Sequence, residues 1–272
     1  SLVGLGDVYK RQINTGIDFQ LWNGRIQGTF DMYWSKTSDL LLNRSIPTIN
    51  GTGNITENIG ETKNRGLELQ ITSNNIAKKD FDWSTTFNLS HYKTKIVNVG
   101  LYDASGNPVD DIGSRWFIGQ PISVNYDYRF IGIWQITDPS NPNGQQDPNY
   151  RYSIPGYMKY HDKDGVNDIT PADKEIIGSA IPKVTEMCIR DRNVSLSVFL
   201  NAQLGQTANN WLYDVSHNSY RQNRLMVDFW TPENPTNKYP KNSLDTSVNP
   251  MSAGFYEKTD FLRVQDVTLA YR

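Results

Sequence analysis

Residues 62–94 read TKNRGLELQITSNNIAKKDFDWSTTFNLSHYKT and show the same strand pattern twice. Apolar and polar residues alternate from Leu67 to Thr72, and the alternation returns from Phe81 to Ser90 after a polar connection. A period of two is typical of β-strands, because successive side chains of a strand point to opposite faces. The stretch therefore predicts a hairpin of two strands, each with one apolar and one polar face.

The length of these strands leaves two environments open. A strand of about 10 residues rises ~3.3 Å per residue, and at a tilt of about 45° it spans the roughly 25 Å apolar band of an outer-membrane barrel. Trp83 lies near a strand end, where such a barrel carries an aromatic girdle. The polar face is equally compatible with the solvated side of a soluble antiparallel sheet.

A second hairpin precedes the first. Apolar residues alternate through Ile17, Phe19 and Leu21 up to the dipeptide Asn23-Gly24, and the alternation resumes over residues 26–34. Asn-Gly between alternating segments is a strong hairpin signal, because a type I′ turn needs positive φ at both central residues. We predict a tight turn there.

Composition excludes some functions. The 272 residues carry 27 Lys and Arg against 29 Asp and Glu, so the chain lacks the basic surplus of a nucleic-acid-binding protein. No run of about 18 apolar residues predicts a transmembrane helix. Aromatic residues make up 12% of the chain, which suits the girdles of a barrel and also sugar-binding surfaces. The single Cys predicts no disulfide framework.

Two short strings share one origin at the level of DNA. The string GATGTGTATAAGAGACAG encodes DVYKRQ, which stands at residues 7–12, and one base further along it encodes MCIRDR, which stands at residues 187–192. That DNA resembles the transposase end used in sequencing-library adapters. We interpret residues 1–12 and 186–192 as adapter-derived and exclude both from reasoning about the fold.

The connections alternate in length. Residues 37–61 read as a long loop and 73–80 as a short turn, while 97–185 and 204–260 are long excursions rich in Gly, Pro and Asn in which only 125–136 reads as strand. Short turns at one end and long loops at the other are typical of an outer-membrane barrel. Loops of this size without a core of their own are usually functional.

Strand direction predicts a further strand. The strand that ends near Ile96 and the strand at 194–203 both lead into long excursions, so both run toward the same end. An antiparallel sheet then needs one strand of opposite direction between them. We place that strand at 184–193, where the adapter-like residues stand, and expect a broken or stunted ladder there. Residues 261–272 alternate as a last strand.

Three motifs carry a family resemblance. NIGETKNRGLELQ at 58–70, IIGSAIPKVT at 176–185 and FLRVQDVTLAYR at 261–272 occur in this order. Together they resemble the C-terminal barrel region of SusC/RagA-type TonB-dependent outer-membrane transporters. The resemblance covers nearly all of residues 13–272, which we expect to form one partial β-barrel domain.

This resemblance implies a fold and a function. It implies an all-β, 22-stranded antiparallel barrel with long extracellular loops in the outer membrane of a Gram-negative cell. It also implies import of large nutrients such as oligosaccharides or peptides, with energy supplied through TonB and with a SusD-like surface lipoprotein as lid. The TonB box, plug and remaining strands of that family are not among these residues, so we expect transport to need more than this segment.

An acidic loop is the candidate metal site. It reads YHDKDGVNDITPADKE, and its carboxylates suit Ca²⁺, which prefers several converging oxygen ligands. The motif departs from a calcium loop at Tyr160, where an acid is missing, and at Asn167-Asp168, which displaces the usual apolar residue; the resembled family often has a better-formed loop here. A solvated turn is the alternative. The candidate ligands are Asp162, Asp164, Asp168 and Asp173.

Four aromatic residues are candidates for stacking on sugar rings: Trp116, Tyr126, Tyr128 and Trp134. Packing of the loop against the barrel rim is the alternative role. His91, His161 and His217 have no zinc-ligand spacing, and no GxSxG motif is present.

Three functions compete at this point. The first is a segment of a transporter, the second a soluble carbohydrate-binding β-sandwich module, and the third a secreted glycoside hydrolase. Strand length separates the first two, because sandwich strands run about 5–6 residues. We favour the transporter and expect no enzyme activity.

Overall fold

The computed structural model describes residues 6–45, 54–78, 82–138, 153–166, 168–192, 194–210, 227–242 and 248–271. They form two compact units. The first, which we call the sheet unit, lies within Ser1–Val124, Ser179–Gln206 and Thr259–Arg272. The second, the loop unit, lies within Asn125–Gly178 and Thr207–Lys258, so it is built from parts of both long excursions.

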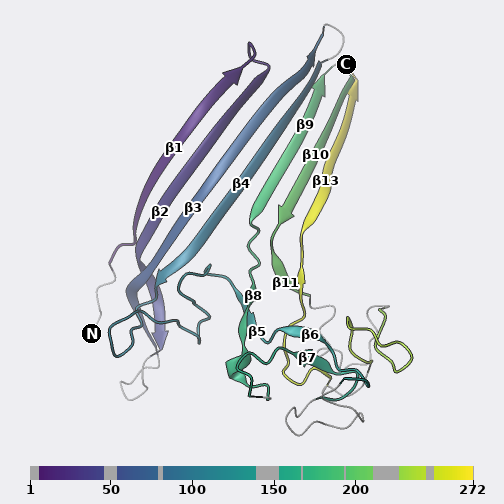
Figure 1. Cartoon of the computed structure of the whole chain (residues 1–272). Coiled ribbons are helices and arrows are strands. Elements are labelled where there is room, and N and C mark those ends of the chain that lie inside the picture. The colour runs from purple at the N-terminus through teal and green to yellow at the C-terminus, as the bar shows by residue number, and fades with distance from the viewer. Residues whose placement is uncertain are drawn as a thin grey trace. The chain divides into compact units, whose positions relative to one another are not determined.

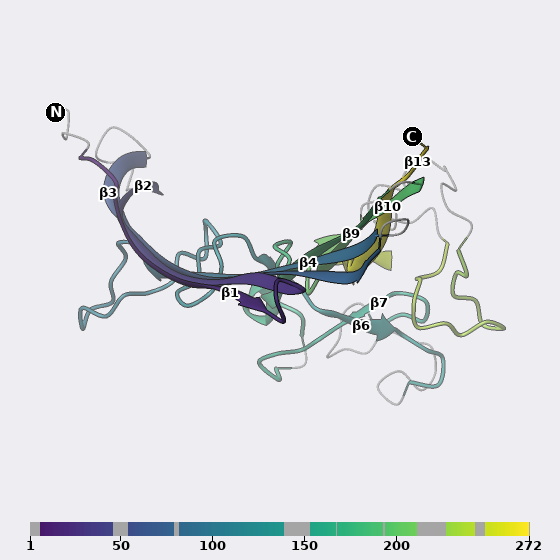
Figure 2. The same cartoon turned by 90° about the horizontal axis from the view of Figure 1, so that it is seen from above.

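The sheet unit contains one sheet of seven strands in the order β1-β2-β3-β4-β9-β10-β13. All of its ladders are antiparallel. Figure 1 shows the strands side by side, and Figure 2 shows the sheet curved across its width. The strands are β1 (Tyr9–Leu21), β2 (Ile26–Ser45), β3 (Asn54–Ala77), β4 (Asp82–Asn98), β9 (Val184–Arg192), β10 (Val194–Leu204) and β13 (Phe261–Tyr271).

Both predicted hairpins are confirmed. In the turn between β1 and β2, Asn23 has φ 54° and Gly24 has φ 85°, and the Arg25 N–H donates to the Trp22 carbonyl at 3.2 Å. These are the positive φ values that the Asn-Gly dipeptide predicts for a type I′ turn. The longest strands, β2 and β3, have 20 and 24 residues and pair within this one sheet, which argues against the sandwich of short strands.

The register gives β1 to β4 two different faces. Rows such as Ile17, Phe30, Leu69 and Leu89 lie directly opposite one another across the four strands. One face, the apolar face, is lined by Ile13, Ile17, Phe19, Leu21, Ile26, Phe30, Met32, Trp34, Leu67, Leu69, Ile71, Trp83, Phe87 and Leu89. The other, the polar face, is lined by Asn14, Asp18, Gln20, Gln27, Thr29, Asp31, Glu68, Gln70, Thr72, Thr86, Asn88 and Ser90.

The prediction of a long loop at 37–61 is wrong for most of these residues. β2 continues to Ser45 and β3 begins at Asn54, and the two remain paired to the Ser45↔Asn54 register. Ladder hydrogen bonds form between backbone groups, so a hairpin extends through residues that show no apolar alternation. Alternation disappears wherever both faces of a strand meet a polar environment, and the sequence signal disappears with it.

The strand predicted between β4 and β10 is present as β9, antiparallel to both neighbours. Its ladders are interrupted as expected. Met187 and Ile189 are two positions apart on β9. Their partners are three positions apart on each neighbouring strand, Thr85 and Asn88 on β4 and Val198 and Asn201 on β10. β9 is therefore one residue short against each neighbour. A one-residue slip moves a strand's positions to the opposite face. On the loop side of the slip, Glu186 therefore occupies a register position of the apolar face.

The loop unit has short strands: β5 (Asn125–Asp127), β6 (Phe130–Ile133), β7 (Met158–Tyr160), β8 (Glu175–Gly178), β11 (Thr207–Asn209) and β12 (Tyr256–Lys258). They pair as β5-β8, β6-β7 and β11-β12, and a short 3-10 helix, η2 (Pro171–Asp173), precedes β8. The strand expected over 125–136 is thus divided into β5 and β6. No helix among the described residues is long and apolar enough to cross a membrane.

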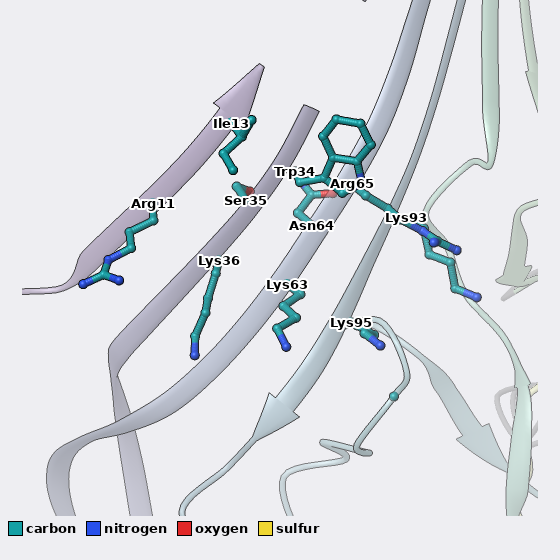
Figure 3. Close-up of a pocket in the computed structure, with 11 residues that line it drawn as sticks. Arg11, Ile13, Trp34, Ser35, Lys36, Lys63, Asn64, Arg65, Lys93 and Lys95 are labelled. Carbon is teal, nitrogen blue, oxygen red and sulfur yellow. The ribbon is translucent and has the colours of Figure 1, made fainter. Parts of the chain in front are cut away.

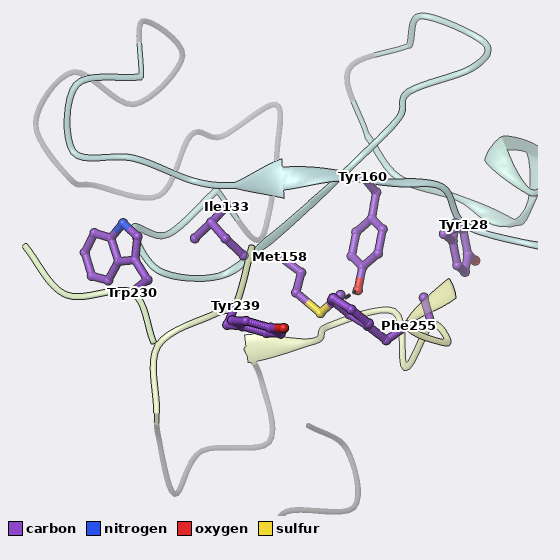
Figure 4. Close-up of a cluster of buried hydrophobic side chains, with 8 residues drawn as sticks. Tyr128, Ile133, Met158, Tyr160, Trp230, Tyr239 and Phe255 are labelled. Atoms are coloured by element: carbon purple, nitrogen blue, oxygen red, sulfur yellow. Dashed lines mark hydrogen bonds between the residues drawn. The ribbon is translucent and has the colours of Figure 1, made fainter. Parts of the chain in front are cut away.

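The loop unit also has a hydrophobic core, which corrects the expectation that these excursions have none. Tyr128, Ile133, Met158, Tyr160, Trp230, Tyr239, Ala253 and Phe255 pack together and are each at most 8% exposed (Figure 4). The core escaped sequence analysis because its members come from two excursions and show no period. Hydrogen bonds join the same segments: Trp230 Nε1 donates to Gln135 Oε1 at 2.7 Å, and Gly254 N to Asp127 Oδ2 at 2.9 Å.

The adapter interpretation makes a direct prediction about DNA. If residues 186–192 come from an adapter, genomic DNA sequenced across the codons for 184–194 will encode a different strand and turn. We expect that strand to match β4 and β10 residue for residue, without the slip. Genomic DNA that keeps the codons for EMCIRDR would contradict the interpretation.

Candidate functional site

The structure separates the four aromatic candidates. Trp116 belongs to the sheet unit, where its backbone forms a bridge with Asp111. Tyr126, Tyr128 and Trp134 belong to the loop unit. Tyr128 is 7% and Trp134 5% exposed, and a cation lies over each ring, Lys174 Nζ at 5.0 Å and Lys159 Nζ at 4.3 Å from the ring centroid.

This burial favours packing over sugar stacking for two of the candidates. A ring that stacks on a sugar needs an open face. Tyr128 packs in the core of the loop unit and Trp134 packs in a second cluster with Tyr157 and Val248, and a lysine lies over each ring. Burial raises the pKa of the Tyr128 hydroxyl, and the nearby Asp127 and Asp173 carboxylates raise it further. Trp116 and Tyr126 are only partly buried.

The structure brings three of the four acidic candidates together. Carboxylate oxygens of Asp162, Asp164 and Asp173 lie within 4.8 Å of one another, and Asp168 is not part of the group. Asp173 sits at the end of η2 and is fully buried. Sequence spacing predicted this convergence because a Gly, here Gly165 with φ 74°, permits the tight turn that folds the loop back on itself.

Asp173 organises the loop through four hydrogen bonds. Its Oδ1 accepts the N–H groups of Lys163 at 2.8 Å and Asp164 at 3.3 Å. Its Oδ2 accepts the Thr170 N–H at 2.7 Å and the Thr170 hydroxyl at 3.3 Å. The Thr170 hydroxyl in turn accepts the Ala172 N–H at 3.2 Å, which completes a capping box at the start of η2.

These bonds decide the charge state of Asp173. Burial alone raises the pKa of the carboxyl, but the hydrogen bonds from the backbone of Thr170, Lys163 and Asp164 outweigh it, so the pKa is lowered overall. Hydrogen bonds to the charged form favour that form. The buried carboxylate is therefore ionised at neutral pH.

The donor set limits what the cluster can hold. A carboxylate oxygen accepts about two hydrogen bonds, and both oxygens of Asp173 already accept two. Asp162 Oδ1 accepts the Gly165 N–H at 2.7 Å and Asp164 Oδ1 accepts the Val166 N–H at 3.2 Å. All three carboxylates of the cluster thus already accept hydrogen bonds from the backbone, and Asp173 has no acceptor capacity left. This makes the cluster a poorer match to Ca²⁺, which takes 6–8 oxygen ligands, than the sequence indicated.

Sequence analysis missed an ionic network beside this loop. Glu175 on β8 accepts from Arg129 Nε at 2.7 Å and from Arg129 Nη2 at 3.1 Å, and His161 Nδ1 lies 2.9 Å from Glu175 Oε1. The Arg129 hydrogen bond, against the effect of burial and with help from His161, lowers the pKa of the Glu175 carboxyl. His161 and Arg129 are 14 and 46 residues away from Glu175 along the chain, so no local sequence pattern predicts the network.

Comparison with known proteins agrees with the long-strand sheet. Residues 9–179 match the family described as TonB dependent receptor-like, beta-barrel. This match covers more than half of the chain, and the chain belongs to that family. Members of this family are outer-membrane β-barrels that serve as receptors and transporters.

Particular relatives extend the match. The chain is 28% identical over 95% of its length to TonB-dependent receptor P26 of Formosa agariphila, covering 27% of that protein. It is also 28% identical over 95% of its length to TonB-dependent receptor SusC of Bacteroides thetaiotaomicron, covering 25%. The chain thus spans about a quarter of these curated relatives.

A solved structure shares the fold. The structure of the RagAB peptide transporter superposes with a TM-score of 0.65 over 96% of this chain and 28% of that chain, at 20% identity.

We expect Asp173→Asn to destabilise the loop unit by roughly 1–3 kcal/mol, because an amide nitrogen placed among four donors leaves buried groups unpaired. The pKa of Asp173 is lowered in the folded state, so its contribution is complete above the ordinary carboxyl pKa of about 4 and is lost as pH falls through the folded-state pKa. Chemical unfolding at pH 7 and pH 3, followed by Trp fluorescence, measures both effects. An unchanged unfolding midpoint at pH 7 would contradict this role.

The response of the unfolding temperature to added calcium tests whether the acidic cluster binds a metal ion as well as stabilising the loop. Asp162→Asn is the matched variant, because it removes a carboxylate of the cluster whose Oδ1 accepts the Gly165 N–H, whereas the buried Asp173 accepts four hydrogen bonds. If Asp162 and Asp164 ligate Ca²⁺, millimolar calcium will raise the unfolding temperature of the wild-type protein, and Asp162→Asn will abolish that rise. An identical calcium response in Asp162→Asn would remove Asp162 as a ligand.

Proposed function

We propose that this chain is part of the barrel of an outer-membrane TonB-dependent transporter that imports large nutrients, oligosaccharides or peptides. In this proposal β1 to β4, β9, β10 and β13 cross the outer membrane, with the apolar face toward lipid and the polar face toward the lumen. The short turns face the periplasm and the long connections face outside. The proposal extends the family assignment to this chain's own location and cargo.

One observation carries the proposal. On the apolar face, Trp83 on β4 and the row of Trp34, Arg65 and Lys93 are separated by 10 residues along β4, from position 83 to position 93. At ~3.3 Å per residue and a tilt of about 35–45°, that separation corresponds to roughly 23–27 Å across the sheet, the height of the apolar band of an outer-membrane barrel. The apolar face of β1 to β4 carries no Lys, Arg, Asp or Glu between these rows.

The sheet edges also support a larger barrel. Among the described residues, β1 and β13 are each paired on one side only, and they have 13 and 11 residues. Long unpaired edges invite association with other strands, and barrels remove them by closure. Further strands, as in relatives about four times longer, would supply the missing neighbours.

Cargo and partners follow from the resemblance. RagAB is named as a peptide transporter, and SusC as a TonB-dependent receptor. We propose a peptide or oligosaccharide as substrate, a SusD-like surface lipoprotein as partner over the long loops, and the TonB complex as energy source through regions outside this segment. The buried core of the loop unit suits a rigid extracellular platform for such a partner, and no enzyme activity is proposed.

Fractionation of cells tests the location. We expect the full-length protein that carries this segment to partition with the detergent-solubilised outer membrane and to change its gel mobility on heating. Closed barrels have no open edges, so they resist unfolding by detergent until heated. Recovery as a soluble protein in osmotic-shock fluid would contradict the proposal.

A pair of neighbouring substitutions tests the two faces. Leu69→Lys places a charge on the apolar face near the middle of the band, and we expect it to cost roughly 2–4 kcal/mol of folding free energy in lipid. Gln70→Lys places the same charge on the polar face and is expected to be mild. Urea unfolding of the two full-length variants in lipid vesicles measures the difference. Equal costs would refute the assignment of the faces.

A further inference from the structure

Five cationic side chains gather where the apolar face ends toward the long connections. Lys36 on β2, Lys63 on β3 and Lys95 on β4 lie directly opposite one another in register, and Arg65 and Lys93 form the next pair along the strands. Figure 3 shows Lys36, Lys63 and Lys95 extending side by side from three neighbouring strands. With Trp34 and Ile13 they line a hollow of about 470 Å³.

The register places like charges directly opposite one another, which destabilises the pairing of the strands there. Directly opposite residues of an antiparallel pair have Cβ atoms about 4.5–5.5 Å apart, and like charges there repel. Lys36 forms an ion pair with Glu61, at 2.7 Å. Among the residues that the structure describes, no carboxylate pairs with Lys63, Arg65, Lys93 or Lys95. The row therefore has a surplus of positive charge that an anion would neutralise.

Arg11 extends the same row, opposite Lys36. It stands within residues 1–12, which we interpret as adapter-derived, so only the other five cations are assigned to the site. Those five come from β2, β3 and β4, whose pairing is regular from Leu67 to Lys63 on both sides. Their alignment follows from the same register that produces the two faces.

The position of the five cations indicates which kind of anion they would bind. Lys36, Lys63 and Lys95 share the apolar face with Trp34, and Lys36 stands two residues beyond it on β2. In a membrane-spanning sheet, Trp marks the level of the lipid head groups. The cations thus stand just outside the apolar band, on the lipid side, where lipid phosphates lie. Arg offers a fork of donors that matches phosphate geometry, and Lys adds point charges.

We propose that this row binds the phosphate groups of a phosphorylated lipid in the leaflet that surrounds the long-loop end of the barrel. The proposal rests on the proposed membrane location, which supplies the lipid. Trp34, 43% exposed, and Ile13, 70% exposed, would contact the acyl chains beside the head group. Such a lipid would neutralise the repulsion between opposed lysines and clamp β2, β3 and β4 together at the rim.

Binding of bis-phosphorylated lipid A to the full-length protein in detergent, followed by native mass spectrometry, tests this. We expect the double variant Lys63→Gln with Lys95→Gln to weaken binding roughly 10- to 30-fold, because each Lys near anionic head groups contributes severalfold to affinity. The matched control is Arg25→Gln with Lys78→Gln, which removes two exposed charges beside the short turns at the other end of the sheet. The control should bind as the wild type does.

The probes separate the sources of phosphate. Dephosphorylated lipid A should bind weakly to all variants, and inorganic phosphate should not compete at millimolar concentration. Equal lipid A binding by both double variants, binding without dependence on the lipid phosphates, or displacement by inorganic phosphate would each overturn the proposal. Heat-dependent gel mobility, measured on the same samples, shows whether the barrel itself is present, so failure of the membrane proposal is distinguished from failure of the lipid site.

Discussion

The antiparallel ladder, with its side-chain period of two, determines which side chains of β1 to β4 share a face. Once Asn23-Gly24 fixes the first turn and the β2–β3 and β3–β4 registers follow, each paired position of β1 to β4 is assigned to a face. The same register that aligns Leu69 with Phe30 and Leu89 aligns Lys63 with Lys36 and Lys95. An apolar band and a cationic row at its border are therefore two consequences of one pairing, and a slip of one residue would abolish both.

Much of the sheet was predictable because its signals are local. Alternation located β1 to β4, β10 and β13, and counting strand directions located β9 before any contact was known. Sequence analysis failed at 37–61, where backbone pairing continues without apolar alternation, and in the long excursions, where Tyr128 and Trp230 meet in a core across about 100 residues of chain. Packing between distant segments has no periodic signature, so composition alone made these excursions look like open loops.

The candidate site was predictable in position and less so in role. Residue spacing predicted that Asp162, Asp164 and Asp173 lie together. Only the contacts reveal that Asp173 accepts four hydrogen bonds and forms part of the capping box of η2. Likewise the aromatic candidates were selected from the sequence, but only the structure shows that Tyr128 and Trp134 are buried. The long connections therefore contain a packed core as well as the candidate site residues.

The central claim is that the two faces of this sheet meet lipid and water respectively, and accessibility along β3 tests it most directly. Nitroxide labels placed singly from Gly66 to Thr72 in the full-length protein in lipid vesicles report collisions with oxygen, which concentrates in lipid, and with a water-soluble nickel complex. The account predicts an alternation with a period of two, with oxygen accessibility high at Leu67, Leu69 and Ile71 and nickel accessibility high at Glu68 and Gln70. Equal nickel accessibility at all seven positions would show both faces in water and contradict a membrane-spanning sheet.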